Sequence, residues 1–195
     1  MAGGCGVAAT KRAQSAPIYQ IKVTLKGISP PIWRRLQLRA DTRLSDLHHI
    51  LQIAMGWTDS HLHQFKVGET YYGEPSPDDW MEMRDERKAR LSQVAPGEKA
   101  RLLYDYDFGD SWEHAIVVEK VLAPEPGVHY PVCVKGKRAC PPEDVGGIWG
   151  YASFLEAIGD PAHPEHEDMR EWIGGAFDPE AFDLDEVNAT LRELR

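Results

Sequence analysis

The chain has few cysteines and lacks the long apolar runs that mark secreted and membrane proteins. It holds three cysteines in 195 residues, and Cys5 lies in an N-terminal stretch rich in alanine and glycine. Such a small, odd number argues against a disulfide framework and favours a reducing compartment. Residues 1–17 lack the apolar core of a signal peptide, and no later segment is long and apolar enough for a membrane span. The sequence therefore predicts a cytoplasmic protein with no membrane contact.

Several catalytic signatures are also missing. The sequence contains no G-x-S-x-G, Walker A or G-x-G-x-x-G motif, so nucleophile-elbow hydrolases, P-loop NTPases and Rossmann dehydrogenases have no support. Asp107-Phe108-Gly109 spells the kinase DFG, but no glycine-rich phosphate loop or HRD segment accompanies it. His166-Glu167 begins like a zincin motif, but Arg170 stands where the second histidine belongs. These observations leave open whether the chain is an enzyme.

Basic residues are fewer than acidic residues in this chain. Lys and Arg number 22 against 31 Asp and Glu, which gives a formal net charge of -9. Broad binding to nucleic acid depends on neutralising phosphates, so this balance disfavours DNA as a partner. A local basic patch is not excluded, and Arg34, Arg35 and Arg39 form one candidate along a predicted strand. Charge runs of this kind are more often solvated surface.

Length and composition are those of one globular domain, with 42% apolar and 27% charged residues. We predict a disordered tail over residues 1–17 and a single domain over 18–195. Within it, residues 18–122 form a sheet-plus-helix core and residues 123–195 a loop and helical part.

Hydrophobic periodicity predicts the elements of that domain. Alternation of period two indicates strands, and the 3.6-residue period of residues 44–55, ended by Gly56, indicates a helix. The predicted elements are strands over 18–26 and 32–39, the helix over 44–55, a hairpin around Gly68-Glu69, a long hairpin over 101–122 and a helix over 151–158. This order predicts an α+β fold with a mixed or antiparallel sheet, a β-grasp-like N-terminal half and a mainly helical C-terminal part.

The segment YDYDFGDSWEH, Tyr104 to His114, concentrates aromatic, acidic and imidazole groups in one hairpin. If Gly109 and Asp110 form its turn, Asp107 lies opposite Trp112 and Asp105 opposite His114, so all four share one face. A carboxylate facing an imidazole can orient a general base, support a metal ligand or make a structural hydrogen bond.

A second dense segment, CPPEDVGGIWGY from Cys140 to Tyr151, is expected to meet that hairpin. Glu143 and Asp144 precede two glycines and suit either a divalent cation or the entry of a helix. The candidate ligand or partner site comprises Asp105, Asp107, Asp110, Trp112, His114, Glu143, Asp144 and Tyr151.

His61 and His63 are two residues apart on a predicted strand and would project from one face, as paired metal ligands do. Together with Asp107 and His114 they form the candidate metal set, and a divalent metal is the cofactor that the sequence suggests. Two histidines packed in the core or solvated at an edge would give the same pattern.

Four segments resemble the plasmid pRiA4b ORF-3-like family: IYQIKVTLKGISPPIWRRLQL, LSDLHHILQIAMGWTDSHLHQF, YDYDFGDSWEH and CPPEDVGGIWGYASFLEAI, followed by FDPEAFDLDEVN. The resemblance implies a compact α+β domain, often associated with plasmids or other mobile elements, and some relatives are labelled resolvase-like. It supplies no catalytic residues. Three hypotheses follow: a binding or accessory module for a protein or small-molecule ligand, a metal-dependent hydrolase or nuclease-like enzyme, and a DNA-binding, resolvase-like recombination factor.

Overall fold

The fold is an eight-stranded mixed sheet with helices mostly toward the C-terminus. The computed structural model describes residues 16–76 and 82–194, so the predicted disordered tail lies outside the described residues except for Ala16 and Pro17. The strands are β1 (Ile18–Leu25), β2 (Trp33–Arg39), β3 (His63–Val67), β4 (Thr70–Gly73), β5 (Met83–Asp85), β6 (Arg101–Tyr106), β7 (Trp112–Leu122) and β8 (Val132–Lys137). The helices are α1 (Leu44–Met55), η1 (Glu86–Lys88), α2 (Leu91–Val94), α3 (Gly147–Gly159), α4 (His166–Trp172) and α5 (Leu184–Leu191).

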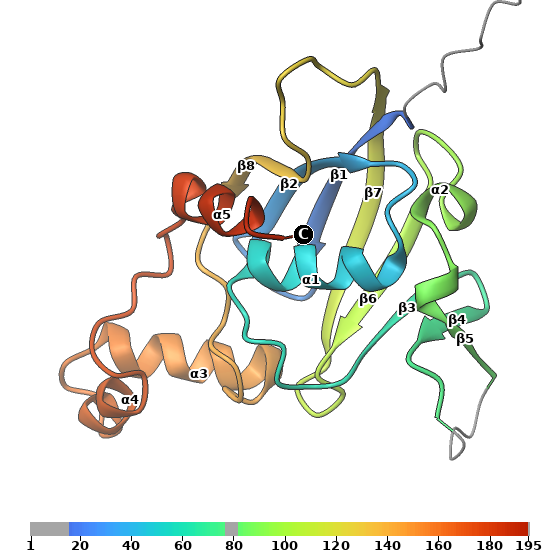
Figure 1. The fold of residues 1–195 in the computed structure, drawn as a ribbon. Helices are drawn as coiled ribbons and strands as arrows, with labels where there is room; N and C mark the ends of the chain where they lie inside the picture. The colour runs from blue at the N-terminus through green and yellow to red at the C-terminus, as the bar shows by residue number, and fades with distance from the viewer. Residues whose placement is uncertain (1–15, 77–81, 195) are drawn as a thin grey trace, which may run out of the picture.

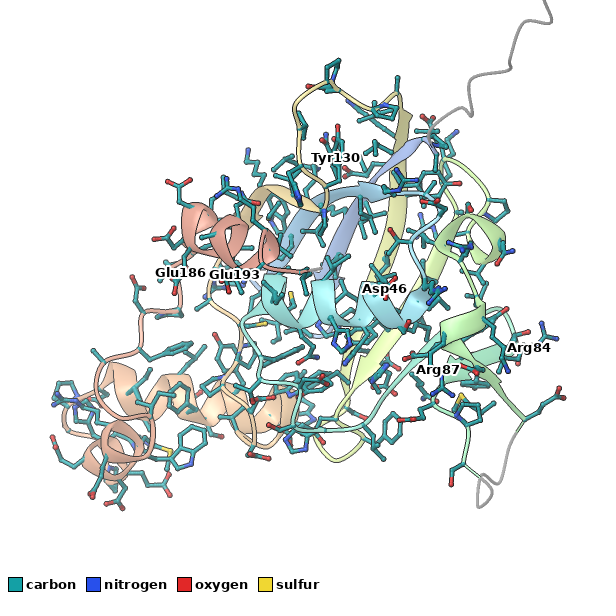
Figure 2. All side chains as sticks on the ribbon, in the orientation of Figure 1. Asp46, Arg84, Arg87, Tyr130, Glu186 and Glu193 are labelled. Atoms are coloured by element: carbon teal, nitrogen blue, oxygen red, sulfur yellow. The ribbon has the colours of Figure 1, made fainter. Side chains whose placement is uncertain are left out.

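The sheet runs in the order β5-β4-β3-β6-β7-β1-β2-β8, and α1 lies across one of its faces (Figure 1). On β1, the side chains of Ile21, Val23 and Leu25 are buried, whereas the alternate residues are half-buried, as expected of a sheet covered on one side. Figure 1 also shows α5 beside α1, and α3 with α4 extending away from the sheet. The charged side chains of Asp46, Glu186 and Glu193 lie on the outer surface of the helical layer that α1 and α5 form (Figure 2).

The helix predicted over residues 44–55 is confirmed as α1, because its apolar side chains Leu44, Leu47 and Leu51 are fully buried. Gly56 ends it with a φ of 96°, a conformation that glycine adopts at little cost. The α+β class is also confirmed, with β4 and β5 parallel and the other pairs antiparallel. The β-grasp arrangement is not shown. Among the described residues, no helix has both the length and the apolar character needed to cross a bilayer.

The predicted register of the β6–β7 hairpin is wrong by one residue. The observed pairs are Tyr104 with His114, Asp105 with Glu113, and Tyr106 with Trp112. The connection is five residues long, from Asp107 to Ser111, rather than the tight turn assumed from Gly109-Asp110. A shift of one residue moves every side chain of one strand to the other face. Asp105 therefore does not share a face with Trp112 and His114.

Candidate functional site

Three loops meet at one end of the sheet: residues 57–62 between α1 and β3, residues 107–111 between β6 and β7, and residues 143–146 before α3. The hydroxyl of Tyr106 donates to Glu143 Oε1 at 2.5 Å, and the Gly146 N–H donates to Asp110 Oδ2 at 3.1 Å. At Gly147, with a φ of 67°, an added Cβ would lie 2.6 Å from the Asp110 carbonyl oxygen. The two dense sequence segments therefore meet, as predicted.

His61, Asp107 and Asp144 come from these three loops and point toward one another. His61 Nε2 lies 3.2 Å from Asp144 Oδ1 and 3.7 Å from Asp107 Oδ2. One ligand atom from each residue lies within 4.8 Å of the other two. His61 Nε2 is shielded from solvent and makes no hydrogen bond within residues 16–76 and 82–194. Three potential metal ligands thus converge, and His61 Nε2 makes no hydrogen bond to either carboxylate.

Local geometry fixes the orientation of the Asp107 carboxylate. Its Oδ1 accepts from the backbone N–H of Gly109 at 3.0 Å, which leaves Oδ2 toward His61. The Asp107 N–H donates to the Leu62 carbonyl at 2.8 Å and ties this loop to the His61 segment. Asp107 and Asp144 have φ values of 57° and 59°, in the left-handed region that few non-glycine residues occupy. Backbone strain of this kind gathers at functional sites.

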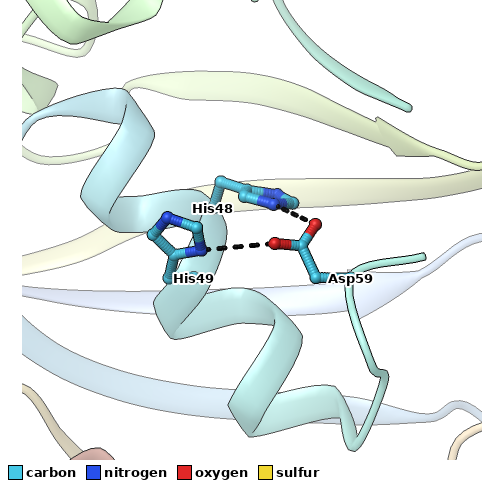
Figure 3. A group of neighbouring side chains, drawn as sticks. All are labelled: His48, His49 and Asp59. Carbon is cyan, nitrogen blue, oxygen red and sulfur yellow. Dashed lines mark hydrogen bonds and ion pairs between the residues drawn. The ribbon is translucent and has the colours of Figure 1, made fainter. Parts of the chain in front are cut away.

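A second group of imidazole and carboxylate side chains lies nearby, where His48 and His49 of α1 face Asp59 (Figure 3). His48 Nε2 is 2.7 Å from Asp59 Oδ1, and His49 Nδ1 is 3.5 Å from Asp59 Oδ2. His48 is only 3% exposed, and its burial beside His63 lowers its pKa to about 4. At neutral pH it therefore carries a single ring proton.

The neighbours of His48 determine where that proton lies. The Asp59 N–H donates to Gln52 Oε1, so the Gln52 amide nitrogen must be the group that donates to the Tyr104 hydroxyl, at 2.9 Å. The Tyr104 hydroxyl proton then points to His48 Nδ1, 2.8 Å away, since otherwise it would be buried without an acceptor. His48 Nε2 keeps its proton and donates to Asp59. His48 thus positions the Asp59 carboxylate and offers no free lone pair to a metal.

The predicted pairing of His61 with His63 is wrong, because His61 precedes β3 and the two side chains take different partners. The His63 ring stacks on His48 with centroids 3.5 Å apart, and its Nε2 lies 2.9 Å from Glu86 Oε2. His63 is therefore held in a structural contact.

His114 and Trp112 belong to the core rather than to the site. His114 is fully buried, its Nδ1 lies 3.3 Å from the Tyr104 carbonyl oxygen, and burial lowers its pKa to about 4. Its ring packs edge-on against Trp57. In the observed register, Trp112 and His114 lie opposite Tyr106 and Tyr104, on the face of the sheet that α1 covers.

Asp105 and Tyr151 also lie away from the converging loops. Asp105 accepts a hydrogen bond from Gln64 on β3 at 3.2 Å, and burial raises the pKa of its carboxyl. Tyr151 is buried in α3 against Phe154 and Phe177, and burial raises its pKa to about 12. Of the predicted residues, the structure brings together His61, Asp107, Asp110, Glu143 and Asp144.

A cavity of about 430 Å³ opens beside these groups and is lined by His48, His49, Asp59, His61, Leu62, His63, Glu86, Arg87 and Phe108, among others. His48, His49, Asp59 and Glu86 are not among the site residues predicted from the sequence. The adjacent histidines of α1 were visible, but nothing in their spacing pointed to Asp59. Their meeting depends on the path of residues 56–62, which returns the chain from α1 to the sheet.

These features define an α+β protein with a sheet covered on one side and an imidazole–carboxylate site at its loop end. The chain belongs to the plasmid pRiA4b ORF-3-like protein family, whose model matches residues 17–186. It is 39% identical over 182 residues to "Uncharacterized protein y4hQ" of Sinorhizobium fredii, covering 92% of this chain and 93% of that protein. The crystal structure of the protein of unknown function MM3350 from Methanosarcina mazei Go1 matches with a TM-score of 0.81 and 40% identity, over 89% of this chain and 98% of that chain. The family resemblance seen in the sequence is confirmed.

Proposed function

We propose that the protein is a binding module whose site holds a divalent transition-metal ion through His61, Asp107 and Asp144. The observation that carries this proposal is the convergence of three ligand atoms from three loops within 4.8 Å. Imidazole with carboxylates suits zinc, manganese and iron(II), which accept mixed nitrogen and oxygen ligands.

A purely structural role for these three side chains would leave His61 poorly accommodated. A buried imidazole nitrogen normally has a hydrogen-bond partner, and one without a partner is costly. His61 Nε2 makes no hydrogen bond within residues 16–76 and 82–194, as is also true of His114 Nε2 in the core, but His61 differs in having two carboxylates within 4 Å. A cation between them would use the free lone pair and neutralise both carboxylates, which supports the metal proposal.

Removing the imidazole is expected to weaken metal binding. Metal-free protein titrated calorimetrically with Zn²⁺ and Mn²⁺ should bind one ion, and His61→Ala should lower the affinity by at least roughly tenfold, the size of effect seen when even an outer-shell partner is lost. His49→Ala is the matched control, because His49 belongs to the other imidazole–carboxylate group. If His49→Ala removes binding and His61→Ala does not, the site is wrongly assigned.

The metal-dependent hydrolase is a second candidate, favoured by the position of Asp59. Three protein ligands leave coordination positions open, as in catalytic metal sites, and a bound divalent metal lowers the pKa of coordinated water. Asp59 lines the adjacent cavity, and His48 binds its Oδ1 at 2.7 Å, whereas His49 approaches its Oδ2 only to 3.5 Å, so Oδ2 can accept a proton. A carboxylate fixed in this way is suited to act as a general base.

The test of this second candidate is hydrolysis of bis(p-nitrophenyl) phosphate by the metal-loaded protein. Asp59→Asn should lower the rate by roughly 100-fold or more, the contribution typical of a general base, while the metal affinity stays unchanged. His129→Gln, at an exposed position, is the control for nonspecific effects. Absence of hydrolysis by the metal-loaded wild-type protein would leave the binding module as the function.

The arginines considered for DNA binding are engaged within the chain. Arg35 makes two hydrogen bonds to Glu119, at 2.6 and 2.9 Å, and Arg39 makes two to Asp41, at 3.0 and 3.1 Å. Arg34 is buried. Because Arg35 and Arg39 already have carboxylate acceptors and Arg34 is buried, the geometry does not favour the resolvase-like hypothesis.

A further inference from the structure

A second cavity, of about 340 Å³, lies between the C-terminal end of α1, residues 139–143 and the segment before α5. Its walls are mainly apolar, from Ala54, Met55, Trp57, Pro141, Pro142, Ile173, Phe177, Ala181, Phe182 and Val187. Arg34 of β2 also lines it, although this side chain is only 2% exposed. A buried cation thus forms part of the wall of a largely apolar cavity.

Arg34 is held by backbone carbonyls and not by a carboxylate. Its Nε donates to the Ala54 carbonyl in the last turn of α1 at 2.7 Å, and Nη1 donates to the carbonyls of Trp33 and Lys137, each at 3.0 Å. These bonds use three of the five guanidinium N–H donors. Nη2 makes no hydrogen bond within the described parts of the chain.

The positive charge of Arg34 has no counter-ion. No described Asp or Glu oxygen lies within 4.0 Å of its guanidinium, whereas the similarly buried Arg138 pairs with Glu180 at 2.9 Å. Burial raises the pKa of the Cys133 and Cys140 thiols, the latter to about 12, so both stay neutral. A buried charge without a partner is strongly unfavourable, and the partial charge of a helix end offsets only part of that cost.

The surrounding residues are arranged closely around the cation. The Phe182 ring centroid lies 4.1 Å from the guanidinium carbon of Arg34. At Gly136, an added Cβ would lie 2.4 Å from the Phe182 ring and 3.0 Å from Arg34 Cδ. Only glycine at this position lets the ring cover the guanidinium.

We propose that this cavity binds a small monocarboxylate with an apolar body, whose carboxylate accepts hydrogen bonds from Arg34 Nη2. One unpaired cation matches one negative charge, and the apolar walls match the rest of the ligand. Glu143 also lines the cavity, with its carboxylate engaged by Tyr106 and Thr58, and its charge disfavours a doubly charged ligand such as phosphate. The lining of this cavity includes none of the proposed metal ligands, so the proposal does not rest on metal binding.

The test compares octanoate with octanamide, which has the same apolar chain and no charge, by calorimetric titration of the full chain. Octanoate should bind at least roughly tenfold more tightly, because a charged acceptor strengthens the hydrogen bond to Arg34. Equal affinity for the two probes, or no octanoate binding, would overturn the proposal.

A substitution of Arg34 itself risks unfolding the protein, because Arg34 also caps the C-terminal end of α1. The second experiment therefore fills the cavity with a larger side chain. Ala181 is exposed and lines the cavity, and Ala181→Trp should weaken octanoate binding at least tenfold. Ala152→Trp, at an exposed position of α3 outside the cavity lining, is the matched control and should leave binding unchanged. Equal octanoate affinity in the two variants would place the ligand elsewhere and contradict the proposal.

Discussion

Lowering the pH from 7.5 to 5.0 is expected to reduce the free energy of unfolding by about 4 kcal/mol through His114 and His48. Burial lowers the pKa of each to about 4, from an ordinary value near 6.5. In the unfolded chain both side chains gain a proton as the pH falls below 6.5, whereas in the folded protein they stay neutral until about pH 4. The contribution of the two neutral histidines to the free energy of unfolding is therefore complete above pH 6.5, and it is lost as the pH falls from 6.5 to 4.

The measurement is urea denaturation at a series of pH values, with the slope of unfolding free energy against pH as the readout. His114→Gln removes one of the two titrating groups and should roughly halve the loss between pH 7.5 and 5.0. His129→Gln, at an exposed position, should keep the wild-type slope. A wild-type free energy that stays constant over this range, or an unchanged slope in His114→Gln, would show that burial does not suppress protonation.

The sequence predicted those elements whose burial pattern is local. In α1 and β1 the apolar residues follow the period of the element, so type and bounds could be deduced from neighbouring residues alone. β8 was missed because only Cys133 among its residues is fully buried and a proline- and glycine-rich passage precedes it. The short β5 lies at a sheet edge within a charged segment, where no alternation reveals it.

The site was harder to predict because one turn decides its geometry. Gly109-Asp110 suggested a tight hairpin turn, but Asp107 leaves the strand in the left-handed region and its side chain caps the Gly109 N–H. That loop shifts the pairing by one residue, so Tyr104 and Tyr106 share the buried face of His114 and Trp112, and it places Asp107 at the loop end beside His61. His61 and Asp107 of the predicted metal set therefore lie together, whereas His114 is in the core and His63 contacts Glu86.

Trp57 connects the two proposed binding sites. Its indole Nε1 donates to the Pro141 carbonyl at 3.0 Å, and its ring stacks on Tyr106 with centroids 5.0 Å apart. The same tryptophan lines the Arg34 cavity, while Tyr106 holds Glu143 near the metal ligands. Residues 140–143 line the Arg34 cavity and the adjacent Asp144 is a proposed metal ligand, so the position of both depends on how α3 begins.

The start of α3 can be disturbed with one methyl group, and Gly150→Ala is expected to damage both fold and site. A Cβ at Gly150 would lie 1.9 Å from the Val145 carbonyl oxygen, closer than any non-bonded contact allows. The Val145 carbonyl must move, and with it Asp144 on one side and Gly146, which donates to Asp110, on the other. We expect a loss of about 1–3 kcal/mol in unfolding free energy from the forced repacking. We also expect a roughly 10- to 100-fold loss of metal affinity, comparable to that for loss of an outer-shell partner.

Gly159→Ala is the matched control, because it adds the same methyl group to the same helix where no heavy atom lies within 4 Å. Alanine favours helix over glycine, so this variant should be as stable as the wild-type protein or slightly more stable. Urea denaturation and calorimetric zinc titration on both variants separate the two effects. Zinc affinity lost in Gly150→Ala but kept in Gly159→Ala would tie the metal site to the loop before α3. Equal affinity and stability in both would show that the entry of α3 does not position Asp144.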